Sequence, residues 1–300
     1  MTSPGDVDWP DLTARAGTAA HDLVGWLMWD PGAIARYEAL GVPGGTGWIV
    51  AWRLAALGEP TSAVAGAVAY SIGQPVIDAV LDLQRGATDT ATVLAARDDS
   101  IEPGLEQIAP GLLSQVGELA DDLWRGVDAV HHGARPMFAA HRALPRPGPD
   151  QPGLSAWLAV NCLRELRGDN HWALCASEGL DDVEVGLLHS AMIDVEEYGD
   201  EEWIARSRGA DDLAVAAAWE RLASRGFAGG AALNDAGRRF RFDLETRTDA
   251  LTEPAWRAVG AECTAALCEA VEAHHEAFVA RIDATAGPRW MPALRSRRVE

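Results

Sequence analysis

The sequence predicts an all-α protein with a small β-wing, made of an N-terminal helical domain and a C-terminal helical domain. Apolar residues recur at helical spacing through almost the whole chain. The short stretch "AGGAAL", residues 228–233, is rich in glycine and lies between two short segments that we expect to be extended. A chain of 300 residues that is 48% hydrophobic and 23% charged is typical of a globular protein with a buried core.

The N-terminal half is predicted to be a series of helices. Asp30 and Pro31 are typical of a helix start, because aspartate caps a helix and proline suits its first position. Gly41 comes directly after Leu40 and favours the end of that short helix. Further helices are expected over residues 62–71, 74–83 and 110–131.

A proline-rich segment separates the two halves. Residues 144–153, "LPRPGPDQPG", carry four prolines, which neither a helix nor a strand accommodates. We therefore expect this segment to link an N-terminal helical domain, residues 1–143, to a C-terminal helical domain, residues 154–300.

The C-terminal half opens with a predicted helix over residues 154–167. Gly168 is expected to interrupt this helix, and Asp169 to cap the next one, which ends near Gly179. The stretch "DDVE", residues 181–184, resembles a capping box and predicts the start of a third helix.

The order of elements after residue 200 is that of a winged helix-turn-helix. Two helices are expected, in "DEEWIAR" and in "DDLAVAAAWERLASRGF", and the glycine-rich turn at 228–233 follows them as the wing. A further helix is expected in "NDAGRRFRFDLETRTDAL", so the module spans about residues 200–250. A final helix is predicted over residues 255–284.

The charge of the chain excludes several kinds of chemistry. The formal net charge is −20, and all 25 basic residues are arginine. Without lysine, the chain forms no Schiff base, anchors no pyridoxal phosphate and has no phosphate-binding P-loop of the Walker type. Signatures of serine hydrolases, dinucleotide-binding folds and HExxH metalloproteases are also absent from the sequence.

Several segments resemble a known family. They include "HDLVGWLMWDPGAIARYEALG", "AWRLAALGEP", "GARPMFAAHRALPRP", "LRELRGDNHWAL", "GLDDVEVGLLHSA" and "WERLASRGFAGGAALNDAGRRFRFDLETRTD". The chain is similar to an actinobacterial family of about 300 residues described only as helix-turn-helix-like. The resemblance implies a helical, winged-helix-containing architecture. The chain departs from that family's pattern at Glu165 and at Met28-Trp29, where a second histidine and a Tyr-Phe pair are common.

Three histidines lie on largely apolar helical faces: His21, His171 and His189. Each is interpreted in two ways, either as a neutral core residue or as part of a site. Asp169 is likewise either a helix cap or an acid, and Arg167 either binds carbonyl groups at a helix end or binds a ligand.

If these residues meet, they form a pocket between the N-terminal helices and the second half. We expect Asp169 and His171 to act as a catalytic pair, and His21, Arg53, Arg167 and His189 to bind the ligand. Tryptophans around the pocket suit an aromatic or lipophilic ligand, and the arginines suit an anionic one, so the expected small-molecule ligand is aromatic or anionic. The sequence identifies neither a cofactor nor a metal. A second candidate, Glu272 with His275, has the spacing of a helical metal site but is better explained as a solvated helix face.

Two functions fit these observations. The first is an intracellular small-molecule-binding protein, which is an enzyme only if the Asp–His pair or a histidine-bound metal is catalytic. The alternative is a ligand-responsive winged-helix transcriptional regulator. Nucleic acid is not an expected partner, because the expected recognition helix begins with two aspartates. A basic patch is nevertheless possible, formed by Arg206, Arg208, Arg238, Arg239 and Arg241. We expect a cytoplasmic protein without a membrane partner, since the N-terminus does not resemble a secretory signal, and a homodimer is one expected assembly.

Overall fold

The computed structural model describes residues 7–44, 46–193 and 195–294. Residues 1–6, which include part of the N-terminal stretch used to judge the secretory signal, lie outside these ranges. Helices of the first half are α1 (Trp9–Gly25), α2 (Pro31–Ala39), α3 (Thr46–Ala55), α4 (Ser62–Ala69), α5 (Gln74–Ala87), α6 (Thr90–Ile108), α7 (Leu112–Gly117), α8 (Ala120–Ala129) and α9 (Pro136–Arg142). A short 3-10 helix, η1 (Trp26–Trp29), continues α1.

Every regular element in the second half of the described chain is also helical. These elements are α10 (Pro152–Ser177), α11 (Asp182–Leu188), η2 (His189–Met192), α12 (Val195–Tyr198), α13 (Trp203–Ser207), α14 (Asp212–Ser224), α15 (Asp235–Val259), α16 (Ala261–Glu272), α17 (His275–Ala286) and η3 (Pro292–Leu294). The predicted all-α fold is therefore confirmed. No helix among the described residues is both long enough and apolar enough to cross a membrane.

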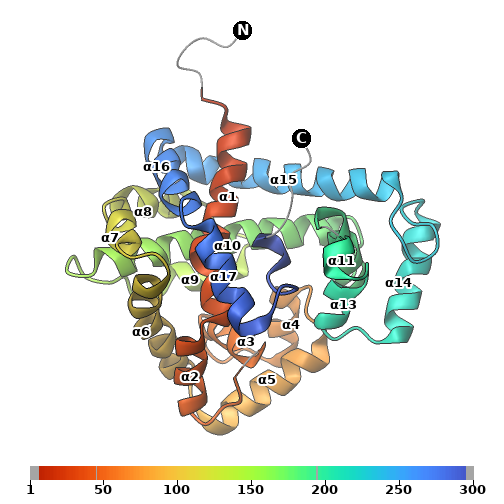
Figure 1. Cartoon of the computed structure of the whole chain (residues 1–300), viewed down its shortest axis with the longest axis horizontal. Helices are drawn as coiled ribbons and strands as arrows, with labels where there is room; N and C mark the ends of the chain where they lie inside the picture. The colour runs from red at the N-terminus through yellow and green to blue at the C-terminus, as the bar shows by residue number, and fades with distance from the viewer. Residues whose placement is uncertain (1–6, 45, 194, 295–300) are drawn as a thin grey trace.

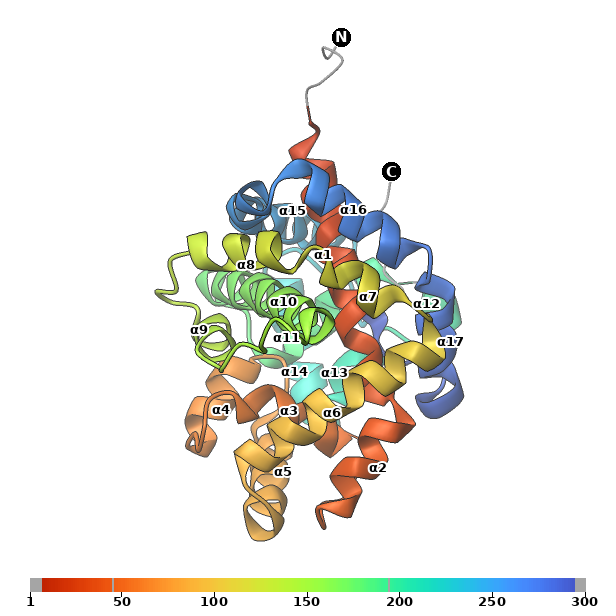
Figure 2. The ribbon, with the colours of Figure 1, turned by 90° about the vertical axis from the view of Figure 1, so that its left-hand side faces the viewer.

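Helix α10 is the axis of the molecule. It packs against α15 and α1, and on its other sides against α7, α8 and α9. In Figure 1, α15 and α10 run side by side across the molecule, and α1 crosses both of them. The view in Figure 2 looks along α10 and shows α1 passing beside it. Helices α11, α13 and α14 gather at the far end of α10 and α15 (Figure 1).

Two clusters of buried apolar side chains hold these helices together. The larger cluster contains residues from both sides of segment 144–153, from Leu12 in α1 to Met291 beyond α17. The smaller one joins the end of α10 to α11, α14 and the start of α15, through residues such as Cys175, Leu187 and Leu222. The two halves of the chain thus share a core, and the division into domains at 144–153 stays a prediction.

The expected break in the helix at Gly168 is wrong. Helix α10 continues without interruption from Pro152 to Ser177, and Gly168 lies in its interior. Glycine costs a helix about 1 kcal/mol relative to alanine, which a long, well-packed helix tolerates. Asp169 consequently caps a different helix from the one expected. Its Oδ2 accepts a hydrogen bond of 2.9 Å from the amide of Phe138, in the first turn of α9.

Two other predicted helices are each divided in the structure. The helix expected over 110–131 is split into α7 and α8 near Gly117. This glycine packs closely against the backbone of Pro152 and Gly153, which leaves little room for a side chain. The helix expected over 255–284 is also wrong, because α15 extends to Val259 and the chain turns at Gly260, whose φ is 101°. Positive φ is open to glycine at little cost, so this turn separates α15 from α16.

Several local signals are confirmed. The Asp30 side chain accepts from the amide of Ala33 and caps α2, and Gly41 adopts a φ of 88° after that helix. Asp181 and Glu184 form a full capping box at the start of α11. These features depend on neighbouring residues alone, which is why the sequence pattern predicts them.

The segment in which a helix-turn-helix is expected contains α13 and α14, with α15 following. Asp211 caps α14, and the chain turns between Ser207 and Asp212. In the segment expected to be the wing, a single antiparallel bridge joins Ala228 to Leu233, and the described residues contain no strand. The expected small β-wing is therefore reduced to one bridge.

Candidate functional site

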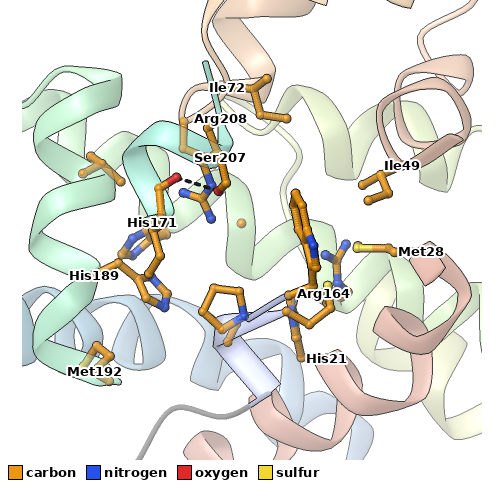
Figure 3. Close-up of a pocket in the computed structure, with 18 of the residues that line it drawn as sticks. His21, Met28, Ile49, Ile72, Arg164, His171, His189, Met192, Ser207 and Arg208 are labelled. Carbon is orange, nitrogen blue, oxygen red and sulfur yellow. Dashed lines mark hydrogen bonds between the residues drawn. The ribbon is translucent and has the colours of Figure 1, made fainter. Parts of the chain in front are cut away.

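A cavity of about 330 Å³ lies where α1, α3 and α10 of the main cluster meet α11, α13 and α15. Figure 3 shows its lining, with His21, Met28 and Arg164 on one side and His171, His189 and Arg208 on the other. The C-terminal segment, residues 289–293, contributes a further wall. Five of the six predicted site residues line this cavity: His21, Arg53, Arg167, His171 and His189.

The three histidines of the cavity are neutral. Burial lowers the pKa of His171 to about 3, with the guanidinium of Arg241 as a second cause. Burial also lowers the pKa values of His21 and His189 well below the ordinary value. In each case neighbouring arginines act in the same direction, because a second positive charge is unfavourable beside them.

His171 has a defined tautomer. Its Nδ1 lies 3.0 Å from the Thr248 hydroxyl, and that hydroxyl donates its own proton to the carbonyl of Leu244 at 2.7 Å. Because a hydroxyl has only one proton, Thr248 must accept from His171, so Nδ1 carries the hydrogen. The lone pair of His171 is then on Nε2, which can accept a hydrogen bond from a ligand.

One end of the cavity is bounded by a buried glutamate between two arginines. Arg53 binds Glu165 with both Nε and Nη2, at 3.0 and 2.9 Å, and Arg164 binds it through Nη1 at 2.8 Å. Burial raises the pKa of Glu165, but the two guanidinium groups outweigh it and hold the pKa below its usual range. The three side chains together carry one net positive charge.

A second ion-pair network links α10 to α15. Arg167 binds Asp249 through Nε at 3.0 Å and also binds Glu245, while Arg241 binds Glu245 at 2.6 Å. Burial opposes the charged form of Arg167, and the two carboxylates nevertheless raise its pKa. This network is balanced in charge and fixes α15 against α10.

Two glycines make room in the site. Gly17 lies against Arg167, whose Nε would be 2.9 Å from a Cβ at that position, so glycine lets the guanidinium cross α1. Gly168 is less crowded than Gly17, because the only atom near a Cβ built there would be Glu165 Oε2, at 3.9 Å. Packing does not require a glycine at 168. The missing side chain instead leaves space in the cavity that Gly168 lines.

Some buried polar atoms of the lining residues have no hydrogen-bond partner among the described residues. They are His21 Nε2, His189 Nε2, Arg164 Nε and Trp29 Nε1. A buried polar group without a partner costs about 1–3 kcal/mol. A cluster of four around one cavity is a reason to expect a polar ligand there.

Asp169 lies outside the site. It is absent from the cavity lining, and its carboxylate faces the start of α9. Burial raises the pKa of Asp169 to about 7 in spite of its hydrogen bonds to α9. Asp169 and His171 are two residues apart on α10 and face different helices, so the structure does not bring the expected catalytic pair together.

The chemistry of the lining favours binding of anions. Its charged residues are the arginines Arg53, Arg164, Arg167, Arg208, Arg241 and Arg289 and the carboxylates Glu165, Glu245 and Asp249. The described residues contain no group of three histidine, cysteine or carboxylate side chains placed to hold a metal ion. Glu272 and His275 do not act together either, because Glu272 binds Arg15 and His275 binds Asp22.

The sequence pattern did not identify most of the residues that line the cavity. Arg164 precedes Arg167 and His171 at spacings of three and seven residues, so helical periodicity on α10 could have identified it. Arg241, Glu245 and Asp249 follow a spacing of four on α15 and carry the same signal. No local pattern marks Arg208 or residues 289–293, because only the tertiary fold brings them to the cavity.

Comparison with known proteins identifies a family. A family model described as a helix-turn-helix family matches residues 13–285. No curated protein matches the chain, and no solved structure matches it. The matched range contains the whole cavity lining except the C-terminal segment 289–293.

Proposed function

The chain belongs to this helix-turn-helix family, and on that premise we propose that it is a cytoplasmic small-molecule-binding protein whose ligand lies in the cavity between α10 and α15. The observation that carries the proposal is the cavity itself, about 330 Å³ in volume. Protein interiors are close-packed and leave few voids larger than a water molecule. A cavity of this size falls in the range of small-molecule sites.

Two further observations support this function. Gly168 leaves space in the middle of α10 although packing would allow a side chain there. The cavity also combines apolar walls, such as Trp29 and Trp290, with polar atoms that have no partner among the described residues. Apolar walls with a few converging polar groups are typical of ligand sites.

We propose binding without catalysis by the Asp169–His171 pair. The Asp169 carboxylate is engaged by the amide of Phe138, outside the cavity. An imidazole whose pKa is about 3 is a weak general base at neutral pH. The role left to His171 is to accept a hydrogen bond from the ligand.

The test is binding of N-phenyl-1-naphthylamine, an uncharged aromatic probe that fluoresces in apolar surroundings. We expect saturable binding of one probe per chain, and we expect Gly168→Leu to weaken it at least about tenfold, since overfilling a packed site costs about 1–3 kcal/mol. Leucine is a better helix former than glycine, so the variant should remain folded.

The matched control is Gly86→Leu. Gly86 is also a helical glycine, near the end of α5, and nothing lies within 4 Å of a Cβ built there. We expect this variant to bind the probe like the wild type. Absence of saturable binding, or equal binding by all three proteins, would refute a ligand in this cavity.

A ligand-responsive winged-helix regulator is the second candidate. The observation that favours it is the position of the cavity beside the helix-turn-helix: Ile204 and Ser207 of α13 and Arg241 of α15 line it. Helix α13 comes directly before α14 and α15 directly after it, so a ligand in the cavity would contact both helices that flank α14 in the chain. Only this second candidate requires the module to be a winged helix, with the segment around the single bridge at 228–233 as its wing.

A further inference from the structure

Arg208 differs from the four arginines of the cavity that are paired with carboxylates, Arg53, Arg164, Arg167 and Arg241. Its backbone is fixed, because its carbonyl accepts a hydrogen bond of 2.8 Å from the amide of Gly73 and its amide donates to Ala205. Its side chain extends toward the cavity beside Ser207, on the same side as His171 and His189 (Figure 3). Among the described residues, no carboxylate forms an ion pair with Arg208 and no acceptor receives a hydrogen bond from its guanidinium.

The electrostatic surroundings of Arg208 are positive. Burial lowers its pKa to about 10, and the neighbouring charges of Arg53 and Arg241 act in the same direction. Those two arginines are themselves paired, with Glu165 and Glu245 respectively. Arg208 is thus a partly buried cation that faces two further cations across the cavity. Such a group is unfavourable unless an anion joins it.

The carboxylates of the cavity are not free to neutralise Arg208. Glu165 is engaged by Arg53 and Arg164, and Glu245 by Arg167 and Arg241. Asp249 lies against Arg167. The lining therefore has positive charge in excess, in a protein whose net charge is −20. This local excess marks the site for a negatively charged group.

The rest of the cavity has the opposite character. Met28, Trp29, Ile49 and Ile72 line it as apolar side chains, and Trp290 lies 4.6 Å from Trp29, ring centre to ring centre. A ligand that is only a small inorganic anion would leave these walls without contacts. An anionic group attached to an aromatic body would satisfy both parts of the cavity.

We propose that the ligand of this cavity is an aromatic organic acid whose carboxylate binds the guanidinium of Arg208 and whose ring packs between Trp29, Ile49 and Ile72. This inference rests on the proposed function and specifies its ligand class. The guanidinium fork matches a carboxylate or a sulfonate, which have the same charge and similar oxygen acceptors. The Nε2 of His171 lies on the same side and is suited to a hydroxyl on the acid.

Two probes with the same ring system test the inference. One is 8-anilino-1-naphthalenesulfonate, which carries a sulfonate, and the other is uncharged N-phenyl-1-naphthylamine, which lacks it. We expect the wild type to bind the sulfonate more tightly than the uncharged probe. Arg208→Gln should weaken the sulfonate about tenfold or more, because a charged hydrogen bond contributes about 1.5–3 kcal/mol, and should leave the uncharged probe within about twofold.

Two control variants accompany Arg208→Gln. Arg208→Lys keeps the charge, and we expect it to recover most of the sulfonate affinity. Arg239→Gln removes the same charge from an exposed position on α15 outside the cavity lining, and it should bind both probes like the wild type. Thermal unfolding checks that Arg208→Gln is folded, and removal of an unpaired cation should not lower its midpoint.

The outcomes separate this inference from the proposed function. If the uncharged probe binds and Gly168→Leu blocks it, but Arg208→Gln leaves the sulfonate affinity unchanged, the anion site at Arg208 is refuted while the cavity remains a ligand site. Equal losses of both probes in Arg208→Gln would also refute it, because the arginine would then be shaping the cavity and not binding the charge. If neither probe binds the wild type, the proposed function fails first.

Discussion

His171 is kept neutral by its surroundings, and this neutrality has a measurable effect on stability. In the folded protein the pKa is about 3, because the ring is buried and Arg241 is near. In the unfolded chain a histidine has a pKa of about 6.5. Above about pH 6.5 the ring is neutral in both states. Below it, only the unfolded chain takes up the proton, so the free energy of unfolding falls as the pH falls.

We expect His171→Gln to remove this part of the pH dependence. Between pH 6 and pH 4, the wild type should lose about 1.4 kcal/mol more per pH unit than the variant. Urea unfolding at pH 7, 6, 5 and 4 measures the difference. The same substitution at an exposed histidine, His132→Gln, is the matched control. A His171→Gln curve parallel to the wild type would contradict a neutral, buried His171.

At the scale of single elements, α10 connects the site to the rest of the fold. Its Asp169 reaches across to the amide of Phe138 and caps the short helix α9. Its Glu165, Arg167 and His171 form one side of the cavity. One helix thus positions a structural carboxylate on one face and cavity-lining residues on another.

Asp169→Ala should therefore lower stability without affecting the cavity. Loss of a helix cap costs about 1–2 kcal/mol, and Asp169→Asn, which keeps an acceptor oxygen, should lose less. Urea unfolding at pH 7 gives the stability, and titration with N-phenyl-1-naphthylamine gives the affinity. If Asp169→Ala is folded but binds the probe much more weakly, the prediction is contradicted and Asp169 contributes to the site.

Sequence patterns predict the elements that depend on near neighbours. The caps at Asp30 and Asp181 are of this kind, because each is made within four residues. The continuity of α10 through Gly168 is not, because tertiary packing on several sides of the helix outweighs the small helix propensity of one glycine. The role of Asp169 was not predicted for the same reason, because its partner Phe138 is 31 residues away in the chain and no local pattern connects the two.

The candidate site was predictable only in part for the same reason. Helical faces with a histidine identified His21, His171 and His189, since their periodicity is local. Arg53 and Arg167 also lie in the cavity. The pairing that decides which arginine is available to a ligand involves residues far apart in the chain, such as Arg53 with Glu165. No local pattern in the sequence therefore identifies Arg208 as a residue of the cavity.

At the scale of the whole molecule, charge is distributed unevenly. The chain is strongly acidic, while the cavity carries more arginines than carboxylates. The first turn of α14, which would approach a nucleic acid, exposes Asp212 and Leu213 after the capping Asp211. Arg241 belongs to the buried network with Glu245, so it is not part of a basic surface patch with Arg238 and Arg239.

We accordingly expect no salt-dependent DNA binding. Fluorescence anisotropy of a labelled duplex of mixed sequence, at 50 and 200 mM salt, should show no saturable signal. A regulator would bind the duplex more weakly at the higher salt concentration, because each neutralised phosphate releases counterions. Such binding, reduced by Arg238→Gln together with Arg239→Gln, would favour the second candidate function over the first.

The C-terminal segment that walls the cavity has a consequence for kinetics. Trp290 packs on Trp29, and the carbonyl of Arg289 accepts a hydrogen bond of 3.1 Å from the indole of Trp203, so this segment is held from both sides of the cavity. If an occupant leaves past this segment, these contacts must open first. Its residence time would then follow the opening rate of the segment, so ligands of different affinity would depart at similar rates and differ mainly in how fast they are captured.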